Sequence, residues 1–235
     1  MERGSFSGFT IIIPTLNEAN NIGRLIAALA GRYKGVHIIV SDDGSRDGTR
    51  EEVLEASGAN SNILLFDHSK FKEHGLTASV VDAARLVKTE YVIVMDGDLQ
   101  HPPEVVGKIA AGLRKSDLCI GVRTQVKNWG LHRIILSKGI SYIVYLVFRI
   151  RGKATCSDMM SGFFGIRAEI LERLARRNRK GFVLDGYKVL LDILRMLDKN
   201  ARIFEVGYPT FHPRNEGRSK LRIKHMIEVL VSAFR

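Results

Sequence analysis

Cysteine is scarce in this sequence, and no apolar run is long and uninterrupted. Both disulfide-stabilised proteins and membrane-spanning proteins are therefore disfavoured. The 235 residues include two cysteines, Cys119 and Cys156, and neither has a CxxC or other metal-ligand spacing. A disulfide framework is therefore not expected. No stretch reaches the roughly 18 to 20 apolar residues of a membrane-spanning helix, and residues 1–13 lack the apolar segment of a signal peptide. We expect neither a transmembrane helix nor a signal peptide in this chain.

The first apolar segment is also not followed by GxGxxG, which argues against a dinucleotide-binding Rossmann domain. What is present is an alternation of short apolar segments and amphipathic segments, typical of strands and helices. The expected strands are 9–13, 36–40, 62–66, 91–95, 117–122 and 203–206. The expected helices are 18–30, 49–57, 76–87, 103–114, 134–150 and 186–197. This pattern predicts an α/β fold with a mostly parallel sheet flanked by helices.

Basic residues outnumber acidic ones, 36 to 25, which gives a formal net charge of +11. The excess favours an anionic partner, such as a phosphorylated substrate, an anionic membrane surface or a nucleic acid. We expect no nucleic acid, because no known binding motif is present and acids at the strand ends would repel a phosphate backbone. The apolar segment 134–150, flanked by Arg133 and Arg149, indicates either a helix lying on a membrane or an ordinary buried helix.

Two carboxylates follow the expected strand 91–95, at the end where parallel sheets bind ligands. Only Gly97 separates Asp96 from Asp98, and Gln100 comes two residues later. Oxygen ligands of this kind suit Mg²⁺ or Mn²⁺, which often shares them with substrate phosphates. Glycine between the two acids allows a ligand to approach closely. The segment predicts a site for a divalent cation and a diphosphate, although the same acids could simply cap the following helix.

Further polar residues follow the strand at 36–40, in the segment DDGSRDGT at 42–49. Asp43 can accept hydrogen bonds from a base or a ribose. Asp47, Gly48 and Thr49 fit turn and helix-start chemistry better. His101 is interpreted as a residue that supports its loop or starts a helix, rather than as a general base.

Three segments in this order resemble the nucleotide-diphosphate-sugar-binding fold of family 2 glycosyltransferases: PTLNE at 14–18, DDGSRDGT at 42–49 and DGDLQHPPE at 96–104. Three later segments are similar to the dolichol-phosphate mannose synthases: SDMMSGFFGIR at 157–167, DGYKVLLDIL at 185–194 and RNEGRSKL at 214–221. The resemblance implies a GT-A-like, Rossmann-like fold in a single domain, residues 1–235. Its nucleotide-sugar-binding half would be 1–124, and its acceptor-binding half 125–235.

Site residues follow from the same resemblance. The donor site would comprise Pro14, Leu16, Glu18, Asp43, Asp96, Gly97, Asp98, Gln100 and Lys188. The divalent cation, Mg²⁺ or Mn²⁺, would be held by Asp96, Asp98 and Gln100. The acceptor phosphate would be bound by Arg123, Arg133, Ser137, Arg214 and Lys220. The catalytic residues would be Asp98, Arg123, Arg133 and Arg214. Two positions depart from the family pattern, because Leu16 stands where an aromatic residue is frequent and Arg218 where an acid is common.

The resemblance implies metal-dependent, inverting transfer of mannose from GDP-mannose to dolichyl or another polyprenyl phosphate. A lipid phosphate is already an anion, so it needs an electrostatic cradle rather than a general base. Arginine suits that task because its fork binds phosphate at two points. Two alternatives remain: a UDP-glucose-dependent transferase with the same acceptor, and a transferase acting on a sugar hydroxyl. The second needs a base, for which Asp158 is the candidate; Asp158 could instead orient a basic residue, contact the sugar or be structural.

A polyprenyl phosphate stays in the bilayer, so the enzyme must come to it. We therefore expect a peripheral protein at the cytoplasmic face of a membrane, with interface helices around 133–150 and 221–235. Burial of apolar side chains and attraction to anionic lipid would hold it there. A membrane-anchoring partner or a homo-oligomer could add to the anchorage.

Overall fold

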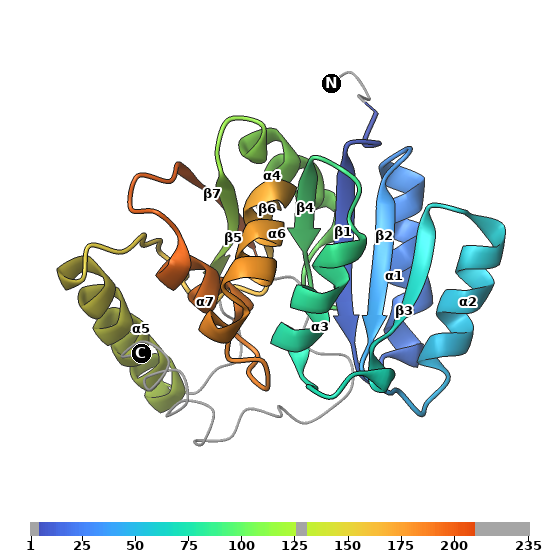
Figure 1. Ribbon diagram of the computed structural model, residues 1–235, viewed down its shortest axis with the longest axis horizontal. Helices are drawn as coiled ribbons and strands as arrows, with labels where there is room; N and C mark the ends of the chain where they lie inside the picture. Colours follow the sequence, from blue (N-terminus) through green and yellow to red (C-terminus); the bar gives the residue numbers. More distant parts are fainter. Residues whose placement is uncertain (1–4, 126–130, 210–235) are drawn as a thin grey trace.

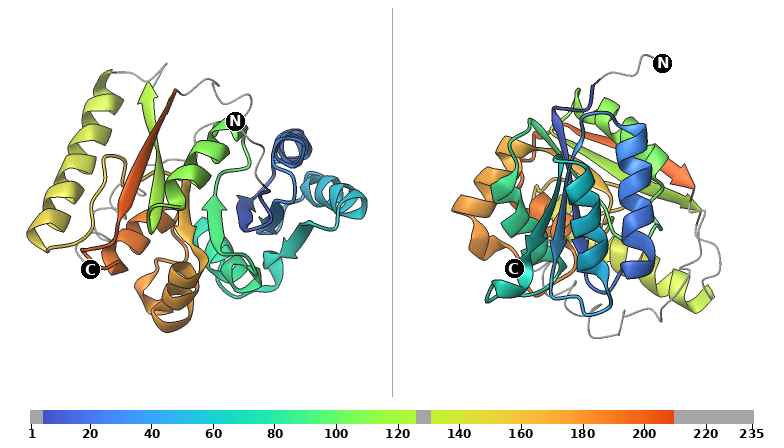
Figure 2. Two further views of the ribbon diagram at one scale, coloured as in Figure 1. Left: turned by 90° about the horizontal axis from the view of Figure 1, so that it is seen from above. Right: turned by 90° about the vertical axis from the view of Figure 1, so that its right-hand side faces the viewer.

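The computed structural model describes residues 5–125 and 131–209, which form one seven-stranded sheet with helices on both faces (Figures 1 and 2). The strand order is β3-β2-β1-β4-β6-β5-β7. The strands are β1 Phe9–Thr15, β2 His37–Asp42, β3 Ile63–Asp67, β4 Tyr91–Val94, β5 Leu118–Gln125, β6 Phe164–Arg167 and β7 Ile203–Pro209. The α-helices are α1 Ala19–Arg32, α2 Thr49–Ala59, α3 Leu76–Ala83, α4 Val106–Leu113, α5 Leu131–Ile150, α6 Ala168–Arg177 and α7 Val189–Met196. Short 3₁₀ helices are η1 His68–Lys70, η2 Ala84–Leu86, η3 Pro103–Val105 and η4 Arg179–Gly181.

Strand β1 lies inside the parallel part of the sheet. It pairs in parallel with β2 on one side and with β4 on the other, and β3 extends this group beyond β2. Strand β6 runs antiparallel to both β4 and β5, whereas β7 is parallel to β5. The expected α/β fold with a mostly parallel sheet is thus confirmed, and β6 is its antiparallel strand.

The parallel strands are apolar along their length because both faces of the sheet are covered. Successive side chains of β1 point to opposite faces, as in any strand. Ile12 packs in the core that also holds side chains of α3, α6 and α7. Ile11 and Ile13 pack in the second core, against α1, α2 and α4. The two cores bury both faces of the sheet, so polar residues lie at the carboxyl ends of its strands.

The segment 158–180 differs most from the sequence-based expectation. No strand or helix was expected in this segment, whereas the chain forms β6 and then α6. In α6, Ile170, Leu171 and Leu174 are buried at helical spacing. The helix was not expected because the neighbouring arginines make this segment polar overall. The other expected elements are present with displaced ends, and the helix expected at 76–87 is divided into α3 and η2.

Helix α5 exposes apolar side chains as well as burying them. Val144 and Phe148 are buried in the core, whereas Tyr142 and Ile150 are 66% and 79% exposed. Among the helices that the structure describes, none has the length and apolar character needed to span a bilayer. Apolar side chains of α5 therefore lie partly in the core and partly on the surface.

Helix α4 packs directly on the backbone of β6. A Cβ atom placed on Gly165 would lie 2.9 Å from Ile109 Cγ2 and 2.9 Å from Leu113 Cδ2. Such distances are shorter than van der Waals contact, so any side chain at this position forces the helix and the strand apart. Gly31, near the end of α1, has open space at the same position instead.

We expect Gly165→Val to lower the free energy of unfolding by about 1–3 kcal/mol, because the added atoms overpack the α4–β6 contact. Gly31→Ala is the control and should be neutral or stabilising by up to about 1 kcal/mol. Urea unfolding of the two variants and the parent measures both effects. Equal midpoints for Gly165→Val and the parent would contradict the close packing of α4 on β6.

Candidate active site

Three polar segments meet at the carboxyl edge of the parallel strands. Thr15 lies opposite Asp42 in the β1–β2 ladder, and the Asp43 N–H donates to the Thr15 carbonyl at 3.0 Å. Gly97 follows β4, and a Cβ atom there would stand 3.0 Å from Thr15 Cγ2 and 3.6 Å from Glu18 Cγ. The residues after β1, β2 and β4 are thereby brought side by side, as the position of the motifs predicted.

The segments after β1 and β2 are held together by hydrogen bonds. Asn17 Oδ1 accepts from the Arg46 N–H at 2.9 Å, with Asn17 in a left-handed conformation at φ 58° that asparagine tolerates well. Asp47 accepts from the N–H groups of Ala19 and Thr49, both at 3.1 Å, and so ties the starts of α1 and α2 together. This geometry agrees with the expected role of Asp47 in a turn at the start of a helix. The neighbouring Leu16 is exposed, and Pro14 is buried in β1.

Asp43 is the centre of a hydrogen-bonded group at the end of β2. Its Oδ1 atom lies 2.9 Å from His68 Nδ1 and 2.8 Å from His74 Nδ1, and its Oδ2 atom accepts from the Gly75 N–H at 2.8 Å. Burial raises the pKa of Asp43, but these hydrogen bonds outweigh burial and hold the pKa below its usual value. The carboxylate is therefore ionised and oriented. No sequence pattern indicated the two histidines, which come from a segment outside the motifs.

The same three residues could in principle hold a metal ion, because their ligand atoms all lie within 4.8 Å of one another. Two ligands of one tetrahedral ion at about 2.1 Å would stand roughly 3.3 Å or more apart. The Asp43 oxygen is closer than that to each histidine nitrogen, at 2.9 and 2.8 Å. Hydrogen bonding therefore accounts for this group better than coordination does.

Asp96 and Asp98 are partly exposed and follow β4 directly. Asp98 Oδ1 accepts from the Gln100 N–H at 3.1 Å, and Leu99 between them has a left-handed φ of 61°. The turn thus presents two carboxylates at the strand end, a donor set of hard oxygens that fits Mg²⁺ or Mn²⁺. Gly162 backs this pair, because a Cβ atom there would come within 3.0 Å of an Asp96 oxygen. Gly162 lies within the motif at 157–167 but was not among the expected site residues.

His101 supports the Asp96 loop from inside. Its ring is buried and stacks on Phe163, with 5.0 Å between ring centroids. Its Nδ1 atom accepts from the Asp96 N–H at 3.0 Å, so the ring proton sits on Nε2. Burial lowers the pKa of His101 to about 4, which keeps the imidazole neutral at physiological pH. This geometry agrees with a supporting role for His101.

A basic group faces the acidic loop from β5 and the segment before α7. Arg123 donates from Nε and Nη2 to Asp158 Oδ2 at 3.3 and 3.2 Å, and Lys188 Nζ donates to the Met160 carbonyl at 2.9 Å. One of the roles considered for Asp158 was to orient a basic residue, and the structure shows this contact with Arg123. Burial and the Arg123 charge lower the pKa of Lys188 to about 8, while Asp96 and Asp158 act in the opposite direction.

Only part of the expected acceptor group can be placed. Arg133 and Ser137 fall in α5, but their side chains lie outside what the structure describes. Arg214, Lys220 and the interface helix expected around 221–235 lie outside the described residues altogether. Arg123 and Lys188 are therefore the basic residues of the expected site whose surroundings are known.

The electrostatic coupling around Lys188 predicts opposite effects of two substitutions on its pKa. Asp158→Asn should lower that pKa further below its present value of about 8, because a stabilising negative charge is lost. Arg123→Gln should raise it, because a repelling positive charge is lost. The pH dependence of the Lys188 side-chain NMR signals measures both, with Arg149→Gln on the exposed end of α5 as control. Shifts in the same direction would contradict the coupling.

Solved structures with the same arrangement identify the class of fold. Glucosyl-3-phosphoglycerate synthase from Mycobacterium tuberculosis, in complex with phosphoglyceric acid, aligns with a TM-score of 0.70 and 20% identity, over 96% of this chain and 79% of that one. Mannosyl-3-phosphoglycerate synthase from Rubrobacter xylanophilus aligns with a TM-score of 0.64 and 15% identity, over 96% of this chain and 72% of that one. The fold is that of the GT-A-like nucleotide-sugar transferases.

Sequence comparison then gives the family. The model of "Glycosyl transferase family 2" matches residues 10–175. The chain is 34% identical over 236 residues to a dolichol-phosphate mannosyltransferase from Pyrococcus furiosus, covering 96% of this chain and 62% of that relative. It is 33% identical over 238 residues to the enzyme of the same name from Saccharomyces cerevisiae, covering 94% and 84%. The chain belongs to glycosyl transferase family 2, which confirms the expected enzyme class, a glycosyltransferase.

Proposed function

We propose that this protein transfers mannose from GDP-mannose to dolichyl or another polyprenyl phosphate, in a metal-dependent reaction with inversion at the anomeric carbon. The observation that carries the proposal is the close opposition of two charged groups at one edge of the sheet. Asp96 and Asp98 follow β4 at this edge. The charges of Asp96 and Arg123 both act on Lys188, and those of Asp98 and Arg123 both act on His101. Similarity to two dolichol-phosphate mannosyltransferases along nearly the whole chain supports the choice of substrates.

On the donor side, Asp43 would accept a hydrogen bond from the nucleoside, and Asp96, Asp98 and Gln100 would hold the divalent cation beside the diphosphate. The cation, when bound, would stabilise the charge on the departing diphosphate. Pro14, Leu16, Glu18 and Gly97 would line the nucleotide. Since Leu16 is 41% exposed, it is accessible for contact with a ligand.

On the acceptor side, Arg123 would bind the lipid phosphate, together with Arg133, Ser137, Arg214 and Lys220. A phosphate oxygen of the acceptor forms the new bond to the anomeric carbon as the bond to the donor diphosphate breaks, so an α-linked donor gives a β-linked product. The attacking oxygen is already anionic, and no proton needs to be removed. Asp158 holds the Arg123 guanidinium at 3.2 Å and thereby orients it for the phosphate.

Contact with a membrane would bring the enzyme to its lipid acceptor. The exposed apolar side chains of α5, Tyr142, Ile143, Tyr145, Leu146 and Ile150, support burial of this helix in the membrane interface. Arg149 and Arg151 at its end can meet anionic headgroups. We therefore place the enzyme at the cytoplasmic face of a membrane, with a membrane-anchoring partner or a homo-oligomer as further means of anchorage.

A transfer assay tests the proposed function directly. With Mg²⁺ or Mn²⁺ and dolichyl phosphate in detergent, we expect label from GDP-mannose in the organic phase and none from UDP-glucose. Chelation of the divalent cation should abolish the transfer. Label from UDP-glucose alone would retain the mechanism and change the sugar. No lipid label from either donor, in protein that binds nucleotide, would favour a hydroxyl acceptor with Asp158 as its base.

The metal assignment is tested by Asp98→Asn, which keeps the shape of the side chain and removes its charge. We expect the metal-dependent affinity for GDP, measured by calorimetry, to fall more than about tenfold, because a ligand of the cation is lost. Asp185→Asn makes the same change at an exposed residue and should have no effect. If metal still increases GDP affinity in Asp98→Asn as in the parent, Asp98 is not part of the metal site.

A further inference from the structure

His68 lies between two carboxylates and has no exposed surface. Its Nδ1 atom is 2.9 Å from Asp43 Oδ1, and its Nε2 atom is 3.1 Å from Asp82 Oδ2. Both His68 and Asp82 are almost completely buried. A carboxylate accepts hydrogen bonds and cannot donate them, so both ring nitrogens must carry hydrogen for both contacts to form. His68 is therefore an imidazolium that joins the two acids.

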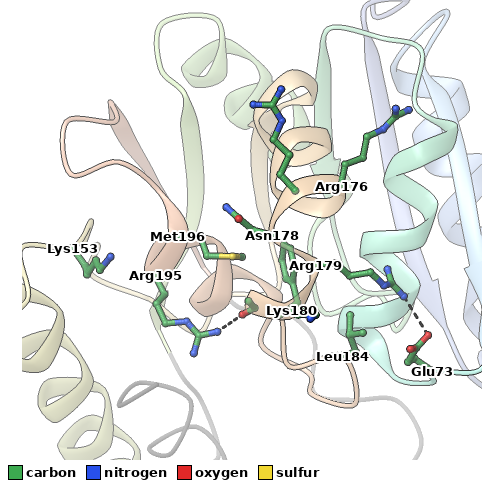
Figure 3. Close-up of a pocket in the computed structure, with 12 residues that line it drawn as sticks. Glu73, Lys153, Arg176, Asn178, Arg179, Lys180, Leu184, Arg195 and Met196 are labelled. Atoms are coloured by element: carbon green, nitrogen blue, oxygen red, sulfur yellow. Dashed lines mark hydrogen bonds and ion pairs between the residues drawn. The ribbon is translucent and has the colours of Figure 1, made fainter.

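Asp82 continues this series toward the surface. Its two oxygens accept from Arg179 Nη1 at 2.7 Å and from Arg179 Nη2 at 3.1 Å. Arg85 stands 3.4 Å from the same carboxylate. Arg179 also contacts Glu73 at 3.4 Å, as the dashed line in Figure 3 shows. Charges thus alternate along Asp43, His68, Asp82 and Arg179, from the carboxyl edge of the sheet to the outside of the molecule.

Asp43 keeps one acceptor position for a ligand. Its Oδ1 atom is shared by His68 and His74, and its Oδ2 atom accepts from Gly75. Each carboxylate oxygen has two lone pairs, so Oδ2 can accept one further hydrogen bond. The Asp43 side chain is 12% exposed. The direction in which it points is set by the groups that hold Oδ1.

We propose that Arg179, Asp82 and His68 act as a positioning series that fixes the Asp43 carboxylate for the nucleoside of the donor. This inference rests on the proposed function, in which Asp43 contacts that nucleoside. Burying the charged His68 and Asp82, and partly burying Asp43 and Arg179, is costly compared with an apolar core of the same shape. In this proposal, the series offsets that cost by fixing the orientation of the Asp43 carboxylate, which contacts the donor. None of the three residues touches the reacting atoms.

Arg179 offers a matched comparison because it lines a basic depression of about 770 Å³ (Figure 3). Lys180 is the next residue and lines the same depression, but it is exposed and makes no ion pair with any residue that the structure describes. Substituting either residue by glutamine removes one positive charge from the same surface. The two variants differ in whether the removed charge holds Asp82.

The test compares Arg179→Gln, Arg179→Lys and Lys180→Gln with the parent. We expect Arg179→Gln to weaken GDP binding and raise the donor KM about tenfold, since the oriented carboxylate becomes mobile. Its kcat should change little, because the nucleoside lies away from the reacting carbon. Arg179→Lys should restore part of the affinity, and Lys180→Gln should match the parent. Calorimetry, steady-state kinetics and the unfolding temperature are measured for each variant.

Two results for Arg179→Gln would overturn the inference. One is GDP affinity in Arg179→Gln equal to that in Lys180→Gln. The other is a lowered unfolding temperature with unchanged GDP affinity, which would make the series structural only. Asp43→Asn separates this inference from the proposed function. If Asp43→Asn binds GDP as well as the parent does, the nucleoside role of Asp43 fails and the inference fails with it. If Asp43→Asn is weakened while Arg179→Gln is not, the inference alone fails.

Discussion

The parallel pairing of β1 with both β2 and β4 is the constraint on which the candidate site depends. In these ladders Thr15 lies opposite Asp42, and Ile12 lies opposite Val94, so the chain leaves three neighbouring strands at one edge. Antiparallel pairing of the same strands would send their polar ends to opposite edges. The apolar side chains that cover both faces of the sheet therefore bring Asp43 and Asp96 to the same edge, although neither residue is part of the core.

Groups of both signs are set against each other at this edge. Asp96 and Asp158 raise the pKa of Lys188, whereas burial and Arg123 lower it to about 8. The proposed reaction, which would bring together a cation, a diphosphate and a second phosphate, would require such a mixture. Carboxylates alone would repel the phosphates, and basic groups alone would repel the cation. The Arg123–Asp158 contact serves this balance, because the acid orients the guanidinium without leaving the edge strongly basic.

Local patterns in the sequence predicted the sheet and the two acidic loops, because each depends on residues close together in the chain. The apolar runs of β1, β2 and β4 and the DGD segment at 96–98 are examples. Strand β6, FGIR, was missed because Gly165 and Arg167 interrupt its apolar residues, whereas the equally short β4, YVIV, is apolar throughout. His68, Asp82 and Arg179 were missed for another reason. Asp82 and Arg179 are 97 residues apart, and nothing in either neighbourhood indicates that they pair.

The buried charges around His68 also explain why a scan for motifs is incomplete. Asp43 belongs to a recognisable segment, but its orientation comes from His68 and His74, which lie outside every motif. A carboxylate that is not held in one orientation would have to be ordered when the ligand binds, and that ordering would reduce the binding affinity. Fixing it in the folded protein transfers the cost to folding, where the two large apolar cores can offset it. The stability of the fold and the orientation of Asp43 are thus linked through the hydrogen bonds of His68 and His74.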